Sequence, residues 1–310
     1  LDALPFVTLL DGMLMETQTR PAPPDPAANQ RRRWTSLLFA LTAAATILVP
    51  FLFWKQTWFG EPLTDEQISQ YLSEAGKPRH IQQAVVQIQE RIERGDASAA
   101  RWYPQMAALK DSPVAELRVT LAWALGADNR SELFRQTLLE LLRDSNLLVR
   151  RNAALSLVRF GDRSGREEIR KMLEPHLLRA PTSGRLRYRL PVGTALNEGA
   201  LLARLERPDG TTVEVRSPLP GKLLRHLAPE GASAAEGTAV ALIAPGKEHV
   251  WEALRALLLI GEKDDLPLVE PFTRAGSDDY PETIRQQAVL TAAALRRRLP
   301  ENAVDTASPP

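Results

Sequence analysis

One short phrase recurs along the chain, and it constrains the fold more than any other feature. The phrase begins with Asp-Ser, continues with an apolar residue followed by Arg, and ends with Ala and Leu at helical spacing. Its Asp stands at Asp111 and again at Asp144, 33 residues later, and its Arg stands at Arg118 and Arg150. Repeats of about 20–50 residues bury their apolar faces only against neighbouring copies, so the phrase predicts stacked helices, an α-solenoid.

The phrase continues on both sides of this pair. Residues 253–261 (ALRALLLIG) match residues 153–161 (AALSLVRFG) at a displacement of 100, and Arg285 lies in one more copy. Upstream, Thr64 and Gln67 have the spacing of a capping box at a helix start. One further apolar stripe at helical spacing follows, formed by Ile81, Ala84, Val85, Ile88 and Ile92.

The repeated phrase resembles HEAT repeats of the short bacterial, phycobilisome-lyase-like type, over about 170 residues. The motif consists of packing positions, so the resemblance implies a fold and no particular activity. Each Arg of the phrase stands where its guanidinium can reach the Asp of its own or an adjacent repeat. We therefore expect structural roles, and no ligand binding, for Asp111, Arg118, Asp144, Arg150 and Arg285.

Between residues 180 and 246 the helical stripes give way to short alternating runs separated by Gly, Pro and Asn, which indicates β-strands. The segment is duplicated internally with an offset of 37 to 38 residues, since residues 184–205 align with residues 221–243. The predicted turn glycines of this β insert are Gly193, Gly199, Gly221, Gly231 and Gly237.

Two such halves, and the stretch 215–243 above all, resemble the biotinyl/lipoyl-like barrel-sandwich domain. In carriers of that family, the hairpin between the halves presents the lysine that is modified. Here its tip is Pro208-Asp209-Gly210 and residues 206–212 contain no lysine, so we expect no attached cofactor. The insert also resembles the domain of periplasmic adaptor (membrane fusion) proteins, although it lacks the long helical hairpin that those proteins carry between the halves.

Residues 34–54 form a run of 21 residues without a charge, close to the length that crosses a bilayer as a helix. A basic flank before the run and aromatic residues at both ends predict a single-pass anchor with a cytoplasmic N-terminus. A cleaved signal peptide and a buried core helix are the alternatives. The residues that carry this prediction are Arg31, Arg32, Arg33, Trp34 and Trp54.

The predicted organisation is mainly α. A disordered cytoplasmic tail (1–33), with Met13 or Met15 as an alternative start, precedes the transmembrane helix (34–54). HEAT-like repeats (61–179), the β insert (180–246), further repeats (247–299) and a disordered tail (300–310) follow.

Composition excludes several chemistries. The formal charge is +1, which gives no general electrostatic support for nucleic-acid binding, and the chain has 0 Cys and 4 His. The standard catalytic motifs are absent. His249 and Glu252, near Asp264-Asp265, suggest a metal cluster, but a solvated helix start is the commoner explanation.

A basic run, from Arg159 to Lys171, could meet anionic lipid or an acidic partner. Acidic residues interleave with it, so we expect a mixed solvent-exposed face. The sequence as a whole predicts a non-catalytic scaffold of the bacterial inner membrane, with its C-terminal part in the periplasm and protein partners in the envelope. No metal, cofactor or nucleic acid is expected. The alternatives are an accessory subunit of a transport, secretion or efflux complex and a lyase-type enzyme.

Overall fold

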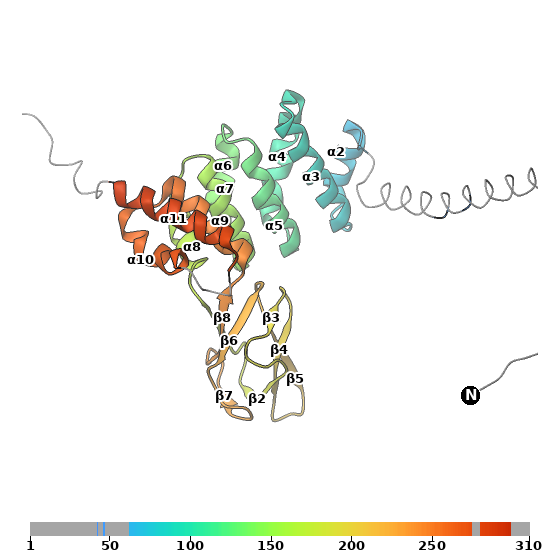
Figure 1. The fold of residues 1–310 in the computed structure, drawn as a ribbon. Coiled ribbons are helices and arrows are strands. Elements are labelled where there is room, and N and C mark those ends of the chain that lie inside the picture. Colours follow the sequence, from blue (N-terminus) through green and yellow to red (C-terminus); the bar gives the residue numbers. More distant parts are fainter. Residues whose placement is uncertain (1–41, 43–45, 47–61, 275–279, 299–310) are drawn as a thin grey trace, which may run out of the picture. The chain divides into compact units, whose positions relative to one another are not determined.

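The computed structural model describes residues 42, 46, 62–274 and 280–298 (Figure 1). Residues 62–310 form one compact unit, distinct from residues 1–61. Apart from residues 42 and 46, the predicted membrane span lies outside the described residues, as do both predicted tails and the residues Arg31, Arg32, Arg33, Trp34 and Trp54. Within the described residues, no helix has the length and apolarity needed to cross a membrane.

Helices make up the described chain from residue 65 to residue 171. The capping box predicted at Thr64 and Gln67 is present at the start of the first helix of the unit. The α-helices are α2 (Asp65–Ser73), α3 (Pro78–Glu93), α4 (Tyr103–Ala108), α5 (Ala115–Ala124), α6 (Glu132–Leu141), α7 (Leu147–Arg159) and α8 (Arg166–Lys171). Short 3-10 turns join them: η1 (Ala97–Trp102), η2 (Leu109–Asp111) and η3 (Leu125–Ala127).

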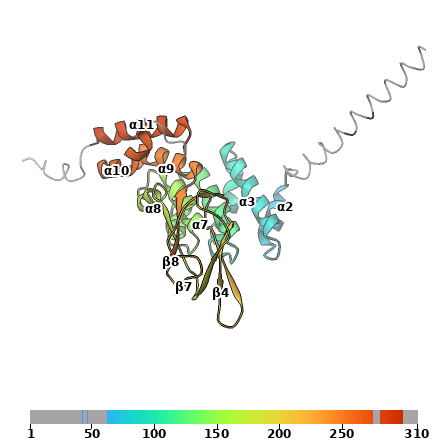
Figure 2. The same cartoon turned by 60° about the horizontal axis from the view of Figure 1, so that its bottom comes forward.

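The helical chain resumes at residue 247, after the β insert. It comprises α9 (Lys247–Ile260), η4 (Lys263–Asp265), α10 (Leu266–Val269), η5 (Glu270–Thr273) and α11 (Glu282–Arg297). The longer helices pack in succession along the chain, α3 on α5, α5 on α7, α7 on α9 and α9 on α11. The shorter helices α6, α8 and α10 pair with α7, α9 and α11. The helical packing therefore continues from α7 to α9 across the insert (Figure 2).

Helix α7 joins two apolar cores. Its residues Val149 and Leu157 belong to the core shared with α2–α6, whereas Ala154 belongs to the core shared with α8, α9 and α11. The stripe predicted on α3 is buried in the first core, with Ile92 at its margin. A single helix that faces both cores makes the two stretches of repeats one packed body.

The insert consists of eight strands: β1 (His176–Arg179), β2 (Gly184–Tyr188), β3 (Ala195–Leu196), β4 (Leu201–Glu206), β5 (Thr212–Arg216), β6 (Gly221–His226), β7 (Ser233–Ala234) and β8 (Ala239–Pro245). They form two antiparallel sheets, in the orders β1-β8-β6-β3 and β5-β4-β2-β7. Each sheet takes two strands from each half of the insert. If β1–β4 are exchanged for β5–β8 in order, the strand order of the first sheet becomes that of the second. The two halves of the insert therefore occupy equivalent places, as the duplicated sequence predicts.

Two predictions about the insert need correction. The first strand begins at His176 and pairs with β8, so the β structure starts before the predicted boundary at residue 180. Gly193, Gly199, Gly231 and Gly237 have positive φ values, as turn glycines do. Gly221 does not: it lies in β6, where a Cβ would collide with the carbonyl oxygen of Ala244 in β8. The close approach of two strands, and no turn, requires glycine there.

Candidate functional site

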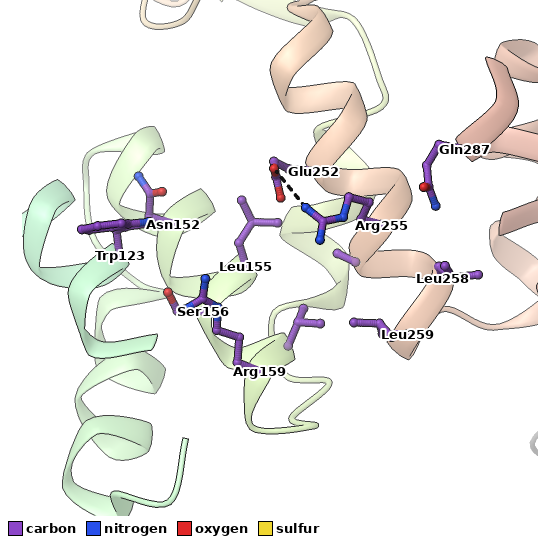
Figure 3. Close-up of a pocket in the computed structure, with 12 residues that line it drawn as sticks. Trp123, Asn152, Leu155, Ser156, Arg159, Glu252, Arg255, Leu258, Leu259 and Gln287 are labelled. Atoms are coloured by element: carbon purple, nitrogen blue, oxygen red, sulfur yellow. Dashed lines mark ion pairs between the residues drawn. The ribbon is translucent and has the colours of Figure 1, made fainter. Parts of the chain in front are cut away.

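A groove of about 520 Å³ lies over α5, α7, α9 and α11 (Figure 3). Successive helices of the array therefore contribute to one surface. Trp123 comes from α5, Leu155 and Arg159 from α7, and Arg255 and Leu259 from α9. The groove spans the position where the β insert interrupts the chain, so it forms only because the helices pack continuously across the insert.

Exposed apolar side chains border this groove. Trp123 is 44% exposed and Leu259 is 65% exposed, and they lie on helices separated in sequence by the whole insert. Leu155 lies between them in Figure 3, and Val158 also lines the groove. Large apolar side chains that gather on a surface, bordered by polar groups, are typical of protein-binding sites.

The polar side chains of the groove bind neighbouring groups of the protein. The Ser156 hydroxyl donates to the carbonyl oxygen of Ala122 at 2.7 Å, and Arg159 Nη1 donates to the carbonyl oxygen of Gly126 at 3.3 Å. Arg255 pairs with Glu252, with 3.7 Å between nitrogen and oxygen. Among the described lining residues, Ser156 supplies the one hydroxyl, and that hydroxyl is bound to a main-chain carbonyl oxygen.

Of the residues predicted to have repeat-structural roles, the structure brings Arg118 and Asp144 together. Arg118 donates from Nε and Nη2 to the two carboxylate oxygens of Asp144, at 2.6 and 3.0 Å. Burial is the largest influence on the pKa of Asp144 and raises it. The hydrogen bonds from Arg118 and the main-chain nitrogen of Asn146, together with the charges of Arg118 and Arg150, outweigh burial, so the pKa lies below its usual value. A bidentate pair of this kind joins the α5 repeat to the α7 repeat.

The other predicted positions behave differently. Asp111 is exposed, and its nearest cation is Lys110 at 3.9 Å. Arg150 donates to the main-chain oxygens of Asp144 and Ser145 rather than to a carboxylate of an Asp. The expectation that Arg285 reaches an Asp is wrong, because it pairs with Glu282 one turn earlier in its own helix.

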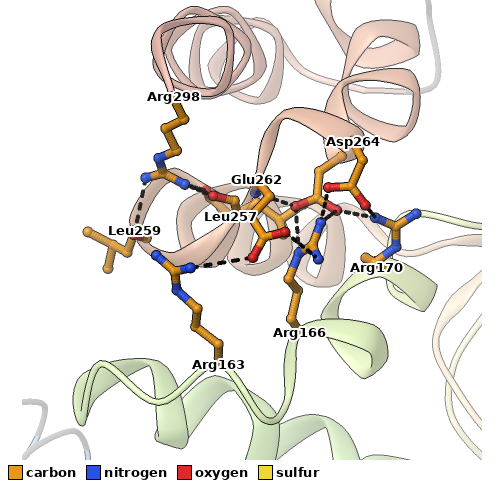
Figure 4. A network of polar contacts seen from close by, with 10 residues as sticks. Arg163, Arg166, Arg170, Leu257, Leu259, Glu262, Asp264 and Arg298 are labelled. Atoms are coloured by element: carbon orange, nitrogen blue, oxygen red, sulfur yellow. Dashed lines mark hydrogen bonds and ion pairs between the residues drawn. The ribbon is translucent and has the colours of Figure 1, made fainter. Parts of the chain in front are cut away.

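Only part of the basic run before the insert is the mixed solvent-exposed face that we predicted: Lys171, 53% exposed, pairs with the exposed Glu167. Arg163, Arg166 and Arg170 bind carboxylates that follow the insert (Figure 4). The centre of the network is Asp265, which is fully buried. Arg166 donates to its two oxygens at 3.0 and 2.9 Å, and Arg170 also contacts it. The network ties α8 to η4 and closes the helical array across the insert.

Arg298 holds the end of α9 (Figure 4). Its guanidinium donates to the carbonyl oxygens of Leu258 at 2.5 Å and Leu259 at 3.1 Å, and it also contacts that of Gly261. The last carbonyl groups of a helix have no partner within the helix, so a cation at this place stabilises the C-terminus of α9.

The structure does not bring His249, Glu252, Asp264 and Asp265 together as a metal site. His249 lies in the first turn of α9, where its Nδ1 is 3.3 Å from Arg151 Nη1, and Glu252 pairs with Arg255. Asp264 and Asp265 bind arginines instead. In the part of the chain that the structure describes, no three His, Cys, Asp or Glu side chains are grouped as metal ligands.

The hairpin between β4 and β5 carries Pro208, Asp209 and Gly210 at its tip. Asp209 Oδ1 accepts hydrogen bonds from the main-chain nitrogen and the hydroxyl of Thr211, at 2.9 and 2.6 Å, and Gly210 has a φ of 81°. The side chain of Asp209 therefore closes the turn on itself. A self-contained turn explains these residue types without a modified side chain.

Comparison with known proteins supports the helical repeats. The sequence profile of the HEAT-repeat family matches residues 105–188, from α4 into β2. Among solved structures, a single-chain, multi-domain long-chain acyl-CoA carboxylase is similar at 19% identity with a TM-score of 0.22. The similarity covers 44% of this chain, which corresponds to 12% of the carboxylase chain. No curated protein matches the sequence.

Proposed function

We propose that the protein is a non-catalytic scaffold that binds a protein partner in the groove over α5, α7, α9 and α11. The observation that carries this proposal is the exposed apolar pair Trp123 and Leu259, set on either side of groove residues whose polar groups are bound within the protein. Stacked helical repeats typically bind partners along an extended surface made by successive helices. The helices would accordingly form an α-solenoid.

The proposal has two further parts, which rest on the sequence. The uncharged run at residues 34–54 and the basic residues before it favour a single-pass anchor in a bacterial inner membrane, with the helical unit in the periplasm. The exchanged strand orders of the two sheets favour a lipoyl-like barrel-sandwich for the insert. Without a lysine in its hairpin, such a module would act as a docking element and not as a carrier.

The test is copurification from native membranes in mild detergent, through a tag at the C-terminus. Leu259→Glu places a charge in the groove, and Leu133→Glu is the matched control, because Leu133 is 44% exposed on α6 and does not line the groove. We expect a partner at fixed ratio with the wild type and the control, and its loss with Leu259→Glu. Equal recovery with both variants would exclude the groove as the binding site.

Fractionation tests the location in the same preparation. Recovery of the protein in the soluble fraction would contradict the anchor while leaving the groove untouched. If the copurifying partner is a transporter or a secretion component, the scaffold is an accessory subunit of that complex.

A further inference from the structure

A buried arginine lies where the β insert leaves the helical array. Arg151 of α7 is 3% exposed. Its Nη1 is 3.3 Å from Nδ1 of His249 in α9, but its Nε has no hydrogen-bond partner in the described part of the chain. A buried guanidinium without full pairing is costly, so such a group calls for an explanation.

The carboxylate beside Arg151 is shared. Glu168 of α8 lies 3.9 Å from Arg151 Nε and 3.5 Å from Arg150 Nε. The oxygen nearer to Arg151, Oε1, is itself buried and without a hydrogen bond among the described residues. Two guanidiniums thus face one carboxylate. The buried atoms Arg151 Nε and Glu168 Oε1 lie too far apart to form a hydrogen bond with each other.

A cavity of about 260 Å³ opens at this place, between α7, α8 and β1. The ionised side chains that line it are Arg150, Arg151, Lys171, Glu168 and Glu174, which gives one cation in excess. His176 also lines the cavity, and burial followed by the nearby arginines lowers its pKa. It is therefore neutral at pH 7.5 and adds no charge there.

The excess of positive charge has a structural origin. In the preceding repeat, the guanidinium of Arg118 binds the carboxylate of Asp144. By the displacement of 100 that relates residues 153–161 to residues 253–261, the position equivalent to Asp144 is Ala244, at the end of β8. The insert thus removes the acid that would bind the arginine of α7.

We propose that this cavity binds a small oxyanion, a phosphate or a carboxylate group, through the guanidiniums of Arg150 and Arg151. Guanidinium groups bind such anions with paired, charge-assisted hydrogen bonds. The anion supplies a negative charge of the kind that Asp144 gives Arg118 in the preceding repeat. With the anion bound, Glu168 is no longer the sole carboxylate shared by the two arginines. Because β1 begins here at His176, occupancy stiffens the connection of the insert to the helices. The site is independent of the groove.

The test is calorimetric titration of the full-length protein in mild detergent at pH 7.5, with inorganic phosphate in one arm and acetate in the other. We expect saturable binding in one arm or both, and the stronger arm identifies the class of anion. Arg151→Gln is expected to weaken binding at least tenfold, Arg151→Lys less. The control, Arg285→Gln, removes an arginine whose partner is Glu282 in its own helix and should leave binding unchanged.

A second measurement does not depend on a folded variant. In NMR spectra of the wild type, the side-chain Nε–H resonance of Arg151 should shift as anion is added. The shift should saturate at the same anion concentration as the heat of binding in the calorimetric titration. Binding that is absent in both arms, or equal in Arg151→Gln and the wild type, would overturn the proposal. So would saturation without any change at the Arg151 resonance.

Discussion

Individual residues of the repeated phrase differ in role although their sequence context is the same. Asp111 and Asp144 both follow a helical unit and precede Ser, yet only Asp144 receives an arginine, Arg118. The arginine that binds the Asp of one repeat comes from the repeat before it. For Asp111, the corresponding position, 33 residues before Arg118, is Val85, which carries no charge. A residue's pairing therefore depends on its neighbour in space, which spacing alone predicts incompletely.

His249 gives a prediction at this scale. Burial, and next the charge of Arg151, lower its pKa to about 4, against an opposing effect of Glu248. In the unfolded chain the pKa of this histidine is near its ordinary 6.5, so between pH 6.5 and pH 4 the unfolded chain binds a proton that the folded protein does not. The stability of the folded protein therefore falls as the pH drops through this range. Between pH 7.5 and pH 5 this histidine should cost the folded state about 2 kcal/mol.

The measurement is urea unfolding at both pH values in phosphate-free buffer, with His249→Gln for comparison. The variant should lose about 2 kcal/mol less than the wild type over this interval. An identical loss in both proteins would mean that His249 is already protonated in the folded state, and that its burial has no effect on its titration.

Helices and strands could be predicted from the sequence where one element buries one of its own faces. The stripe on α3 and the duplicated strands of the insert could be predicted because the period of the pattern is the period of the backbone. Gly221 was misplaced because the reason for it lies in another strand, at Ala244. The buried pairs of Arg166 and Arg170 could not be predicted for a similar reason, since the carboxylate of Asp265 comes almost a hundred residues later.

The link between α8 and η4 carries a prediction at the scale of elements. Asp265→Asn removes the buried charge that Arg166 and Arg170 share, and leaving two guanidiniums without it should cost about 3–5 kcal/mol of unfolding free energy. Asp264→Asn is the matched control, because Asp264 is 63% exposed at the edge of the same network. Its loss should be about 0–1 kcal/mol.

Denaturant unfolding of both variants and the wild type measures the difference directly. Equal destabilisation by the two substitutions would contradict the view that the buried Asp265 holds the two stretches of repeats together. A small cost for Asp265→Asn alone would indicate that hydrogen bonds from the arginines to the asparagine amide suffice there.

The whole helical unit is what creates the groove. Trp123 and Leu259 lie outside the buried stripes of their own helices, so each reads as an isolated exposed residue in sequence. The two residues border the same groove because α7 packs on both α5 and α9. The repeats could be predicted from the phrase, but the groove depends on where the chain resumes after an insert of some seventy residues.

The central claim is that a protein partner binds in this groove, and site-specific photocrosslinking in native membranes tests it most directly. A photoreactive residue is placed at position 259 in one protein and at position 133, on α6, in another. We predict a discrete crosslinked species from position 259 and none from position 133. A species from position 133 alone, or none from either, would contradict the account.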